Sequence, residues 1–484
     1  MQVLVRAVLT IGLGTVVGSA SAAEPTPATP AAISYYQDIR PIFQQHCQGC
    51  HQPAKANGAY VMTDFTLMLK PGESGKPAVT PGKPEASFLF AEIVVKDGKA
   101  EMPKGRPPLT QVQIDKVAAW IQQGAKDDTP ASAKAVAVDA EHPPVYRAAP
   151  VVTSIAFSPD GQLLAVTGYH EIVLHKADGS GIVGRLVGMS ERVQDLEFSP
   201  NGKQLAATGG DPGRFGEVQI WDVEKRKLTL STPLTFDTLY GVSWSPDGSM
   251  IAVGCADNTV RSIDPTSGKQ LLQMGTHSDW VLGTVFSRDG KHLASVGRDM
   301  TMKLTEVGTQ QFVDNVTSIT PGALKGGLLA LDVRPITEKK VTKVPDDSGG
   351  GIEKSYDELI AGGSDGTPRL YKMHRETKRV IGDNANRIRE YEVMPGRVTS
   401  VAFDKDGKRF AASSSLDGKG EVRVYEVDTG KKVVCEKIGG PVYAVAWQPG
   451  AKVVASSGFD GSIWFHDPNT GKLIKEFPAV PLTK

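Results

Sequence analysis

Two cysteines separated by two residues and followed at once by a histidine form the first candidate site in the chain. The run HCQGCHQPAK covers residues 46–55 and holds two of the four cysteines among 484 residues. A cysteine pair with this spacing can bind zinc, exchange electrons as a dithiol, or attach a porphyrin covalently. Each of these chemistries makes a different demand on the surrounding sequence.

The neighbouring residues favour covalent haem attachment. Zinc usually takes a second pair of Cys or His ligands, but the chain has no second closely spaced cysteine pair and His46 is the only other histidine nearby. A thioredoxin-like dithiol needs a βαβ context, which the flanking sequence lacks. Only haem attachment calls for a histidine directly after the second cysteine. The motif predicts that Cys47 and Cys50 tether one haem c and that His51 binds its iron, with zinc and a chance match as the alternatives.

The iron of such a haem takes a sixth ligand or keeps an open position. Met102, in AEMPKGRPPLT, lies in a Pro/Gly-rich loop where a thioether can reach the iron without helical constraints. Met/His ligation is a common electron-transfer arrangement, so we predict Met102 as the sixth ligand. Met62 and Met68 are the alternatives, although their apolar segment YVMTDFTLML is more simply explained as core. An open position would indicate a ligand-binding or peroxidatic haem protein.

Two predicted helices flank the motif and are expected to close the pocket. In ISYYQDIRPIFQQH the apolar residues at helical spacing are Tyr36, Ile39, Ile42 and Phe43. Downstream, Thr110 and Gln113 predict a capping box at the start of a helix that ends near Gly124. We expect the two helices to cross, with Phe43 against Trp120.

The amino-terminal 22 residues resemble a secretory signal. Arg6 precedes an apolar run over residues 7–17, and small residues at 20–22 provide a cleavage site. The run is shorter than the roughly 20 residues that span a membrane, so a retained anchor is the less favoured interpretation. We expect an exported, periplasmic protein with no transmembrane span after cleavage.

Composition divides the rest of the chain into four parts. Residues 23–33 form a Pro/Ala-rich disordered lead, 34–126 a small helical domain, 127–150 an extended linker, and 151–480 a repetitive region with strand-like patterning. Lys and Arg number 54 and are balanced by 54 Asp and Glu. A neutral chain has no overall field that attracts nucleic acid, so we expect none as a partner.

The repetitive region predicts a β-propeller. The anchor IAFSPDG at residue 155 returns in varied form seven times in all, with its marker at Phe157, Phe198, Trp244, Phe286, Val333, Phe403 and Trp447. Each copy reads as four short strands separated by Pro, Asp and Gly turns. Seven such units predict an all-β, seven-bladed propeller. A charged, Gly-rich insertion at residues 336–358 lengthens the fifth unit and is either a docking loop or a tolerated insertion.

The repeats resemble the WD-repeat family. Trp221 and Asp222 give the dipeptide of that name, and GTHSDWVLGTVFSRDGKHLASVGRDMTMKL is the closest copy. The family pattern implies that His277, Ser295 and Asp299 brace the turns of one blade, although Leu304 replaces the usual Trp. Such a fold supports binding platforms and enzymes alike.

The helical segment resembles the planctomycete-type cytochrome c domain. The attachment motif, PGKPEAS, the Met-Pro loop and WIQQGA follow one another in the order of that family, across residues 34–126. The resemblance implies haem at Cys47 and Cys50, with His51 and Met102 as axial ligands. It implies no substrate.

These features predict an electron-transfer protein more than a stand-alone enzyme. One covalent haem would cycle electrons with a redox partner protein, and the propeller would serve as a docking platform. A haem-dependent oxidoreductase with an active site in or beside the propeller is the first alternative. A haem-based sensor is the second.

Overall fold

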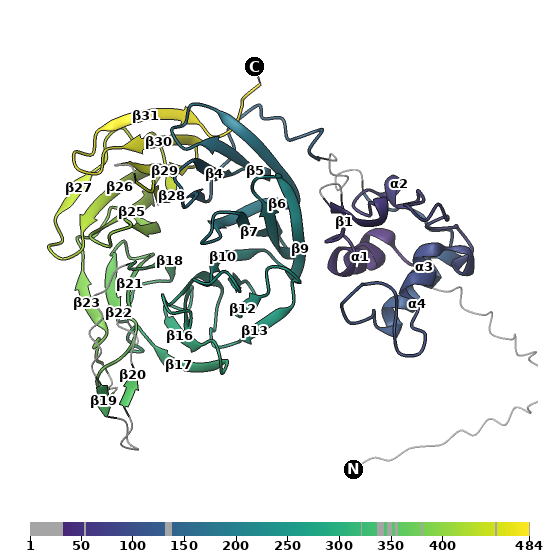
Figure 1. Cartoon of the computed structure of the whole chain (residues 1–484), viewed down its shortest axis with the longest axis horizontal. Coiled ribbons are helices and arrows are strands. Elements are labelled where there is room, and N and C mark those ends of the chain that lie inside the picture. Colours follow the sequence, from purple (N-terminus) through teal and green to yellow (C-terminus); the bar gives the residue numbers. More distant parts are fainter. Residues whose placement is uncertain are drawn as a thin grey trace, which may run out of the picture.

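The chain folds into a small helical part and a ring of strands (Figure 1). The structure, a computed structural model, describes residues 32–52, 55–130, 138–320, 322–335, 343–345, 351–353, 357–378, 380, 382–450 and 453–483. The predicted signal peptide and most of the predicted lead lie outside these ranges, as does much of the insertion in the fifth unit. No helix in the described ranges is long and apolar enough to cross a membrane.

Short helices joined by long loops make up the helical part. Its elements are η1 (Tyr35–Ile39), α1 (Arg40–His46), β1 (His51–Gln52), β2 (Lys55–Ala56), η2 (Asn57–Ala59), α2 (Phe65–Met68), η3 (Pro84–Ala86), α3 (Phe88–Ile93) and α4 (Gln111–Gln122). Strands β1 and β2 form a two-residue antiparallel pair directly after the cysteine motif. The elements α1 and β1 therefore hold the motif between them.

Helix α4 begins as the sequence predicts. The Thr110 side chain accepts a hydrogen bond from the Gln113 backbone N–H, and the Gln113 side chain accepts one from the Thr110 N–H. This capping box satisfies two backbone donors that the first turn would leave unpaired. The helix buries Ile114, Val117 and Ile121 on one face.

The first and last helices of the helical part meet in one core. The rings of Phe43 and Trp120 lie edge to face with their centroids 6.3 Å apart, which confirms the predicted contact. Of the four apolar residues predicted at helical spacing, Ile39, Ile42 and Phe43 are buried and Tyr36 is half-buried, while Tyr35 beside it occupies the core at 3% exposure. Residues 35–39 form a π-helical turn, and its wider turn shifts the buried face by one residue.

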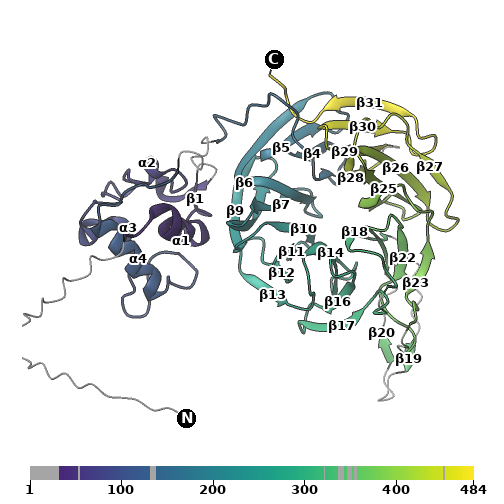
Figure 2. The same ribbon diagram turned by 180° about the vertical axis from the view of Figure 1, so that it is seen from behind.

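Seven four-stranded units form the ring. Blades one and two share one seven-stranded sheet of β3 (Ile155–Phe157), β4 (Leu163–Thr167), β5 (Tyr169–Lys176), β6 (Ile182–Phe198), β7 (Gln204–Asp211), β8 (Phe215–Asp222) and β9 (Lys227–Thr235). Strand β6 serves both blades, because its first half pairs with β5 and its second half with β7. The predicted seven-bladed, all-β architecture is therefore present after the helical part (Figure 2).

Each of the remaining blades is a separate four-stranded sheet. The strands are β10 (Leu239–Trp244), β11 (Ile251–Cys255), β12 (Val260–Ile263), β13 (Gln270–Met274), β14 (Val281–Phe286), β15 (His292–Gly297), β16 (Met302–Glu306), β17 (Gln311–Asn315), β18 (Leu328–Val333), β21 (Glu358–Gly363), β22 (Arg369–Lys372), β23 (Arg387–Glu390), β24 (Arg397–Phe403), β25 (Arg409–Leu416), β26 (Lys419–Glu426), β27 (Lys432–Val434), β28 (Val442–Trp447), β29 (Val454–Gly458), β30 (Ser462–His466) and β31 (Leu473–Pro478). A short pair, β19 (Lys343–Pro345) and β20 (Gly351–Glu353), lies within the insertion. Each of the seven predicted marker residues ends the first strand of its blade.

A recurring turn explains why the repeat motif contains Ser and Asp. The Ser158 hydroxyl donates to the Asp160 carboxylate and accepts from the Leu163 N–H at 2.9 Å. Ser245 and Asp247 form the same turn in the third blade. Side-chain oxygens that bond neighbouring backbone in this way favour turns over continued strand.

The ring closes through contacts between its first and last blades. The Phe157 and Phe465 rings lie 6.2 Å apart within a shared core. The carbonyl of Tyr146, in the predicted linker, accepts hydrogen bonds from the N–H and hydroxyl of Thr483 at 2.9 and 3.0 Å. The carboxyl-terminal end of the described chain is therefore tied to the segment that enters the ring.

Candidate functional site

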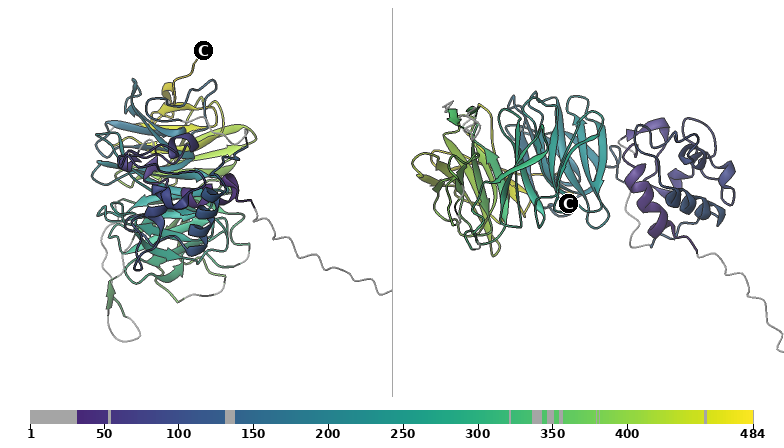
Figure 3. Two further views of the ribbon diagram at one scale, coloured as in Figure 1. Left: turned by 90° about the vertical axis from the view of Figure 1, so that its right-hand side faces the viewer. Right: turned by 90° about the horizontal axis from the view of Figure 1, so that it is seen from below.

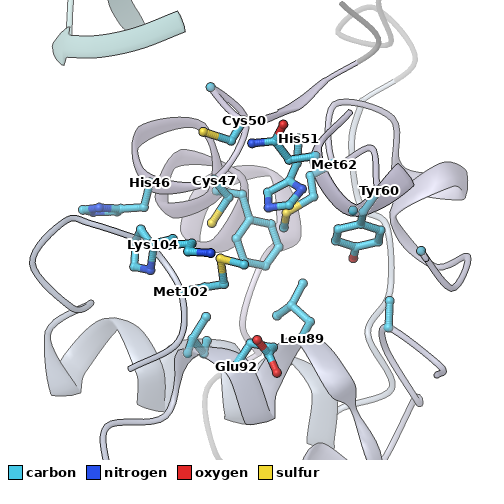
Figure 4. A pocket seen from close by; sticks show the side chains of 18 of the residues that line it. His46, Cys47, Cys50, His51, Tyr60, Met62, Leu89, Glu92, Met102 and Lys104 are labelled. Atoms are coloured by element: carbon cyan, nitrogen blue, oxygen red, sulfur yellow. The ribbon is translucent and has the colours of Figure 1, made fainter. Parts of the chain in front are cut away.

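A cavity of about 660 Å³ lies in the helical part, beside the ring. All four predicted site residues line it, namely Cys47, Cys50, His51 and Met102. In Figure 4 the two cysteines and His51 lie along one side of the pocket, Leu89 and Glu92 lie along the other, and Met102 enters between them. The fold therefore brings together residues that are 55 positions apart at most in the sequence, 47 to 102.

The end of α1 places the cysteine motif in a tight turn. The Cys47 N–H donates to the Phe43 carbonyl at 2.9 Å, and the N–H groups of Cys50 and His51 donate to the Cys47 carbonyl at 3.1 Å. This turn brings the three side chains to the same cavity. The two thiols are not joined in a disulfide. Burial raises the pKa of Cys47 to about 12, so this thiol is protonated at neutral pH and is not a reactive thiolate.

The imidazole of His51 is partly buried at the cavity. Its Nδ1 is buried and forms no hydrogen bond within the described residues. Burial lowers the pKa of His51, and the nearby Asn57 and Tyr60 carbonyls partly offset this effect. A neutral imidazole at a cavity wall has the protonation state that a metal ligand requires.

Met102 reaches the cavity from the loop between α3 and α4. Its N–H donates to the Glu92 carbonyl at 2.9 Å, its peptide bond to Pro103 is cis, and its side chain is half-buried against the helical core. Met62 also lines the cavity, and its sulfur lies beside the His51 ring in Figure 4. Met68 is fully buried in the core and does not line the cavity. Of the three candidate methionines, Met62 and Met102 therefore line the cavity.

The cavity fits a haem by the chemistry of its lining. Phe43, Leu89 and Ile93 supply apolar surface, which suits a large apolar ring system. A pair of unlinked thiols and an imidazole lie at one wall, and thioethers from Met62 and Met102 lie at the cavity as well. Within the described ranges, no group of three or more His, Cys, Asp or Glu side chains gathers to hold a metal ion.

His46 has a different role from His51. Its Nε2 lies 3.2 Å from the Gln113 amide nitrogen, in the capping box of α4. Burial and the nearby Arg106 lower its pKa. His46 therefore connects α1 to α4 beside the cavity.

Charged side chains are part of the cavity lining. Lys76, Lys104 and Arg106 supply positive charge, and Glu73 and Glu92 supply negative charge. The Lys76 ammonium lies 4.7 Å from the centroid of the Phe88 ring. Haem carries carboxylate groups, so cations at the cavity are suitable partners for them.

Sequence reasoning missed the contribution of the ring to this cavity. Ser231 and Pro233 of β9 line it together with the helical residues. Gly49, between the two cysteines, packs against β9, and a Cβ at this position would lie 2.6 Å from the Ser231 carbonyl oxygen. The only local signal was the glycine itself, and nothing in the sequence names its distant neighbour.

The histidine of the fourth blade is a brace, as its family pattern implies. His277 Nε2 lies 2.8 Å from the Ser295 hydroxyl, and its Nδ1 lies 3.0 Å from the Asp299 carboxylate. Burial acts to raise the pKa of Asp299, but the hydrogen bond and charge of His277, together with hydrogen bonds from Thr301 and Ser278, lower it to about 2. Both ring nitrogens are satisfied, and the trio does not line the cavity that holds Cys47, Cys50, His51 and Met102.

Acidic side chains lie on the inner strands of the ring. Glu197 accepts a hydrogen bond from the Trp244 N–H at 2.8 Å, and the Asp332 carboxylate accepts one from the Phe403 N–H at 2.7 Å. Burial and the charge of Asp195 raise the pKa of Glu197 to about 8. Burial also raises the pKa of Asp332 to about 6.

Comparison with known families separates the two parts of the chain. Residues 47–105 match the family model described as Planctomycete cytochrome C. That range contains all four predicted site residues. The family match suggests a haem, and the cavity lined by these four residues is suited to one.

The ring matches WD-repeat models. The model described as WD domain, G-beta repeat, matches residues 143–174, 388–422 and 433–467. The model of the anaphase-promoting complex subunit 4 WD40 domain matches residues 235–288. Together with seven four-stranded blades, these matches establish the second part as a WD-repeat propeller.

Curated relatives are WD-repeat proteins matched over limited lengths. The WD repeat-containing protein 91 homolog of Dictyostelium discoideum is 30% identical over 109 residues, which cover 22% of this chain and 14% of that protein. Human Coronin-7 is 28% identical over 205 residues, covering 40% of this chain and 21% of the relative. The transcription factor unc-37 of Caenorhabditis elegans is 29% identical over 147 residues, or 30% of this chain and 23% of the relative. The chain thus spans less than a quarter of the length of each.

Proposed function

We propose that the protein is an exported c-type cytochrome that transfers electrons through one covalently bound haem, with the propeller as a platform for a partner protein. The observation that carries this proposal is the shared cavity of Cys47, Cys50, His51 and Met102. The match of residues 47–105 to a cytochrome C family supports it independently.

The side chains of the cavity divide the work of holding a haem. Cys47 and Cys50 would attach it through two thioether bonds, while His51 and Met102 would bind the iron. When bound, the haem supplies one-electron transfer between ferrous and ferric iron. Phe43, Leu89 and Ile93 exclude water from the pocket, and a low local dielectric strengthens the electrostatic control of the potential.

The propeller gives the proposed cytochrome a recognition surface. Propellers leave few exposed strand edges and present loops on two faces, and WD-repeat proteins generally bind partner proteins. We propose a redox protein as the partner and the periplasm as the compartment. The sequence pattern of residues 1–22 supports export, as it resembles a signal peptide.

The full chain, produced with a cytochrome c maturation system, tests the proposal. Denaturing mass spectrometry should show one haem retained per chain, and an anaerobic redox titration should show one reversible one-electron step. The absence of any covalent haem would refute the proposal. A second bound chromophore would favour instead an oxidoreductase with an active site in or beside the propeller.

A further inference from the structure

The outer edge of the second blade closes one side of the haem cavity. Strand β9 is the outermost strand of that blade, and in both opposed views it lies at the edge of the ring that faces the helical part (Figures 1 and 2). The view from below also shows the helical part beside the ring (Figure 3). Ser231 and Pro233 of β9 line the cavity. We call these two residues and Thr232 the β9 wall.

The backbone of the cysteine motif packs directly against the β9 wall at Gly49. A Cβ on Gly49 would lie 2.6 Å from the Ser231 carbonyl oxygen and 3.3 Å from the Pro233 ring. Real Cβ atoms essentially never come so near, so a side chain at this position would push the two parts away from each other. Gly49 is not in the left-handed region, and the close approach is therefore the reason for glycine here.

Hydrogen bonds from two arginines join the helical part to the second blade among the described residues. Arg106, which lines the cavity, donates from its guanidinium to the Thr232 hydroxyl at 3.0 Å. Arg214, in the turn between β7 and β8, donates to the Tyr36 hydroxyl at 2.8 Å and pairs with Asp211 at 2.7 Å. Charged donors make stronger hydrogen bonds than neutral ones.

The described ends of the predicted linker are anchored on either side of this contact. Asp128 accepts a hydrogen bond from the Tyr36 N–H at 2.8 Å. At the other end, the Pro144 carbonyl accepts one from Arg185 at 2.7 Å, and the Tyr146 hydroxyl donates to Glu171 at 2.8 Å. Anchored ends shorten the free tether, and a short tether raises the effective concentration of the contact.

We propose that the β9 wall is a built-in part of the haem pocket that shields the side of the haem next to Cys50 and leaves electron exchange to the part of the cavity that the ring does not cover. This inference rests on the proposed function. Gly49 and Arg106 contact the wall, whereas Lys76 and Lys104 line the same cavity and are exposed. Closing one edge keeps small oxidants and water from the haem on that side.

Two variants of the full chain open the wall by independent means. In the Tyr36→Phe/Thr232→Val variant both hydrogen bonds are lost at nearly constant volume, and Gly49→Ala introduces the steric conflict with Ser231. The matched controls are Tyr169→Phe/Thr377→Val, two side chains exposed on the ring, and Gly181→Ala, where a Cβ meets no atom within 4 Å. Neither control touches the cavity.

Hydrogen–deuterium exchange along residues 227–235 reports the contact in both apoprotein and haem-loaded protein. We expect both wall variants to speed exchange in β9 by about tenfold, the change expected when one hydrogen bond from a charged donor is lost. The controls should leave it unchanged. Unaltered exchange in both wall variants would overturn the proposed contact, whether or not haem is bound.

The rate of haem reduction by ascorbate separates shielding from mere contact. With the wall opened, the second-order rate should rise in both wall variants and stay constant in the controls. Faster β9 exchange with an unchanged reduction rate would overturn the shielding role. A chain that retains no haem would refute the proposed function instead, and exchange in the apoprotein would still decide the contact.

Discussion

Two histidines, one in each part of the molecule, show how a brace differs from a candidate site. His277 in the fourth blade has both ring nitrogens paired, one with Ser295 and one with Asp299. His51 in the helical part has a buried Nδ1 without a hydrogen bond among the described residues, and its ring lines a cavity. Buried polar groups are normally paired. His51 therefore differs from His277 in that it lines a cavity beside two thiols, whereas His277 braces the turns of its blade.

Removing the two thiols should have the largest effect on the helical side of this comparison. The Cys47→Ala/Cys50→Ala variant is expected to lose all covalently bound haem, because no other thiol lines the cavity. Denaturing mass spectrometry measures the retained haem. Cys255→Ala, at a buried thiol in the ring, serves as the control and should keep the full amount.

Replacing the two methionines at the cavity one at a time should identify the sixth ligand. Met102→Leu is expected to abolish the far-red sulfur-to-iron absorption band of the oxidised protein and to lower its potential, since thioether ligation raises the potential. Met62→Leu, of similar volume and at the same cavity, should preserve both. The reverse pattern would assign the ligand to Met62 and contradict the proposed role of Met102.

Breaking the brace in the ring should change stability and leave the haem untouched. Asp299→Asn removes the charge that pairs with His277, and we expect the free energy of unfolding of the ring to fall by about 1–3 kcal/mol. Chemical denaturation followed by tryptophan fluorescence measures this change. Asp406→Asn, at an exposed carboxylate, should cost little. An altered haem spectrum in the Asp299→Asn variant would contradict the separation of the two histidines.

The same brace predicts a loss of stability in acid. The pKa of Asp299 is lowered to about 2 in the folded chain, so its contribution is present above the unfolded pKa of 3.8 and is lost as the pH falls toward about 2. In Asp299→Asn this part of the acid dependence should disappear. Denaturation midpoints measured at pH values between about 4 and about 2 test whether stability falls as the pH falls.

A pH effect of the opposite sign concerns Glu197 on the inner strands of the ring. Its pKa is raised to about 8, so the protonated form is favoured in the fold and stability declines as the pH rises from about 4.5 to about 8. Glu197→Gln keeps the side-chain shape and should flatten this decline. Thermal midpoints across that pH range measure it, and a parallel decline in wild type and variant would contradict the raised pKa.

Short-range signals in the sequence predicted many of the elements of the helical part and of the ring. Thr110 and Gln113 predicted the capping box, and Phe43 and Trp120 predicted the core contact, because helix signals act over a few residues. The seven marker residues located the first strand of every blade, since a repeat writes the same short-range pattern many times. The cysteine motif and the Met-Pro loop were predicted to belong to one site, and Cys47, Cys50, His51 and Met102 do line one cavity.

Contacts between distant segments could not be predicted in the same way. Gly49 meets Ser231, and Arg106 meets Thr232, but neither pair leaves a periodic trace in the sequence. The π-helical turn that buries Tyr35 in place of Tyr36 depends on one extra residue per turn, which apolar spacing does not reveal. Met62 looked like core, and it is core at 2% exposure, but one edge of it also faces the cavity.

The hydrogen bonds from Thr483 to the Tyr146 carbonyl can form only late in synthesis of the chain. The helical part and its cavity-lining motif are complete by residue 126 of the predicted domain, hundreds of residues before Thr483 is made. Until Thr483 pairs with Tyr146, and the Ala479 carbonyl meets the His175 ring at 2.8 Å, the first blade lacks its last partners. A chain truncated near residue 483 would therefore contain the complete cysteine motif but an unclosed ring. The unpaired strand edges of that ring would make the chain susceptible to quality-control proteases.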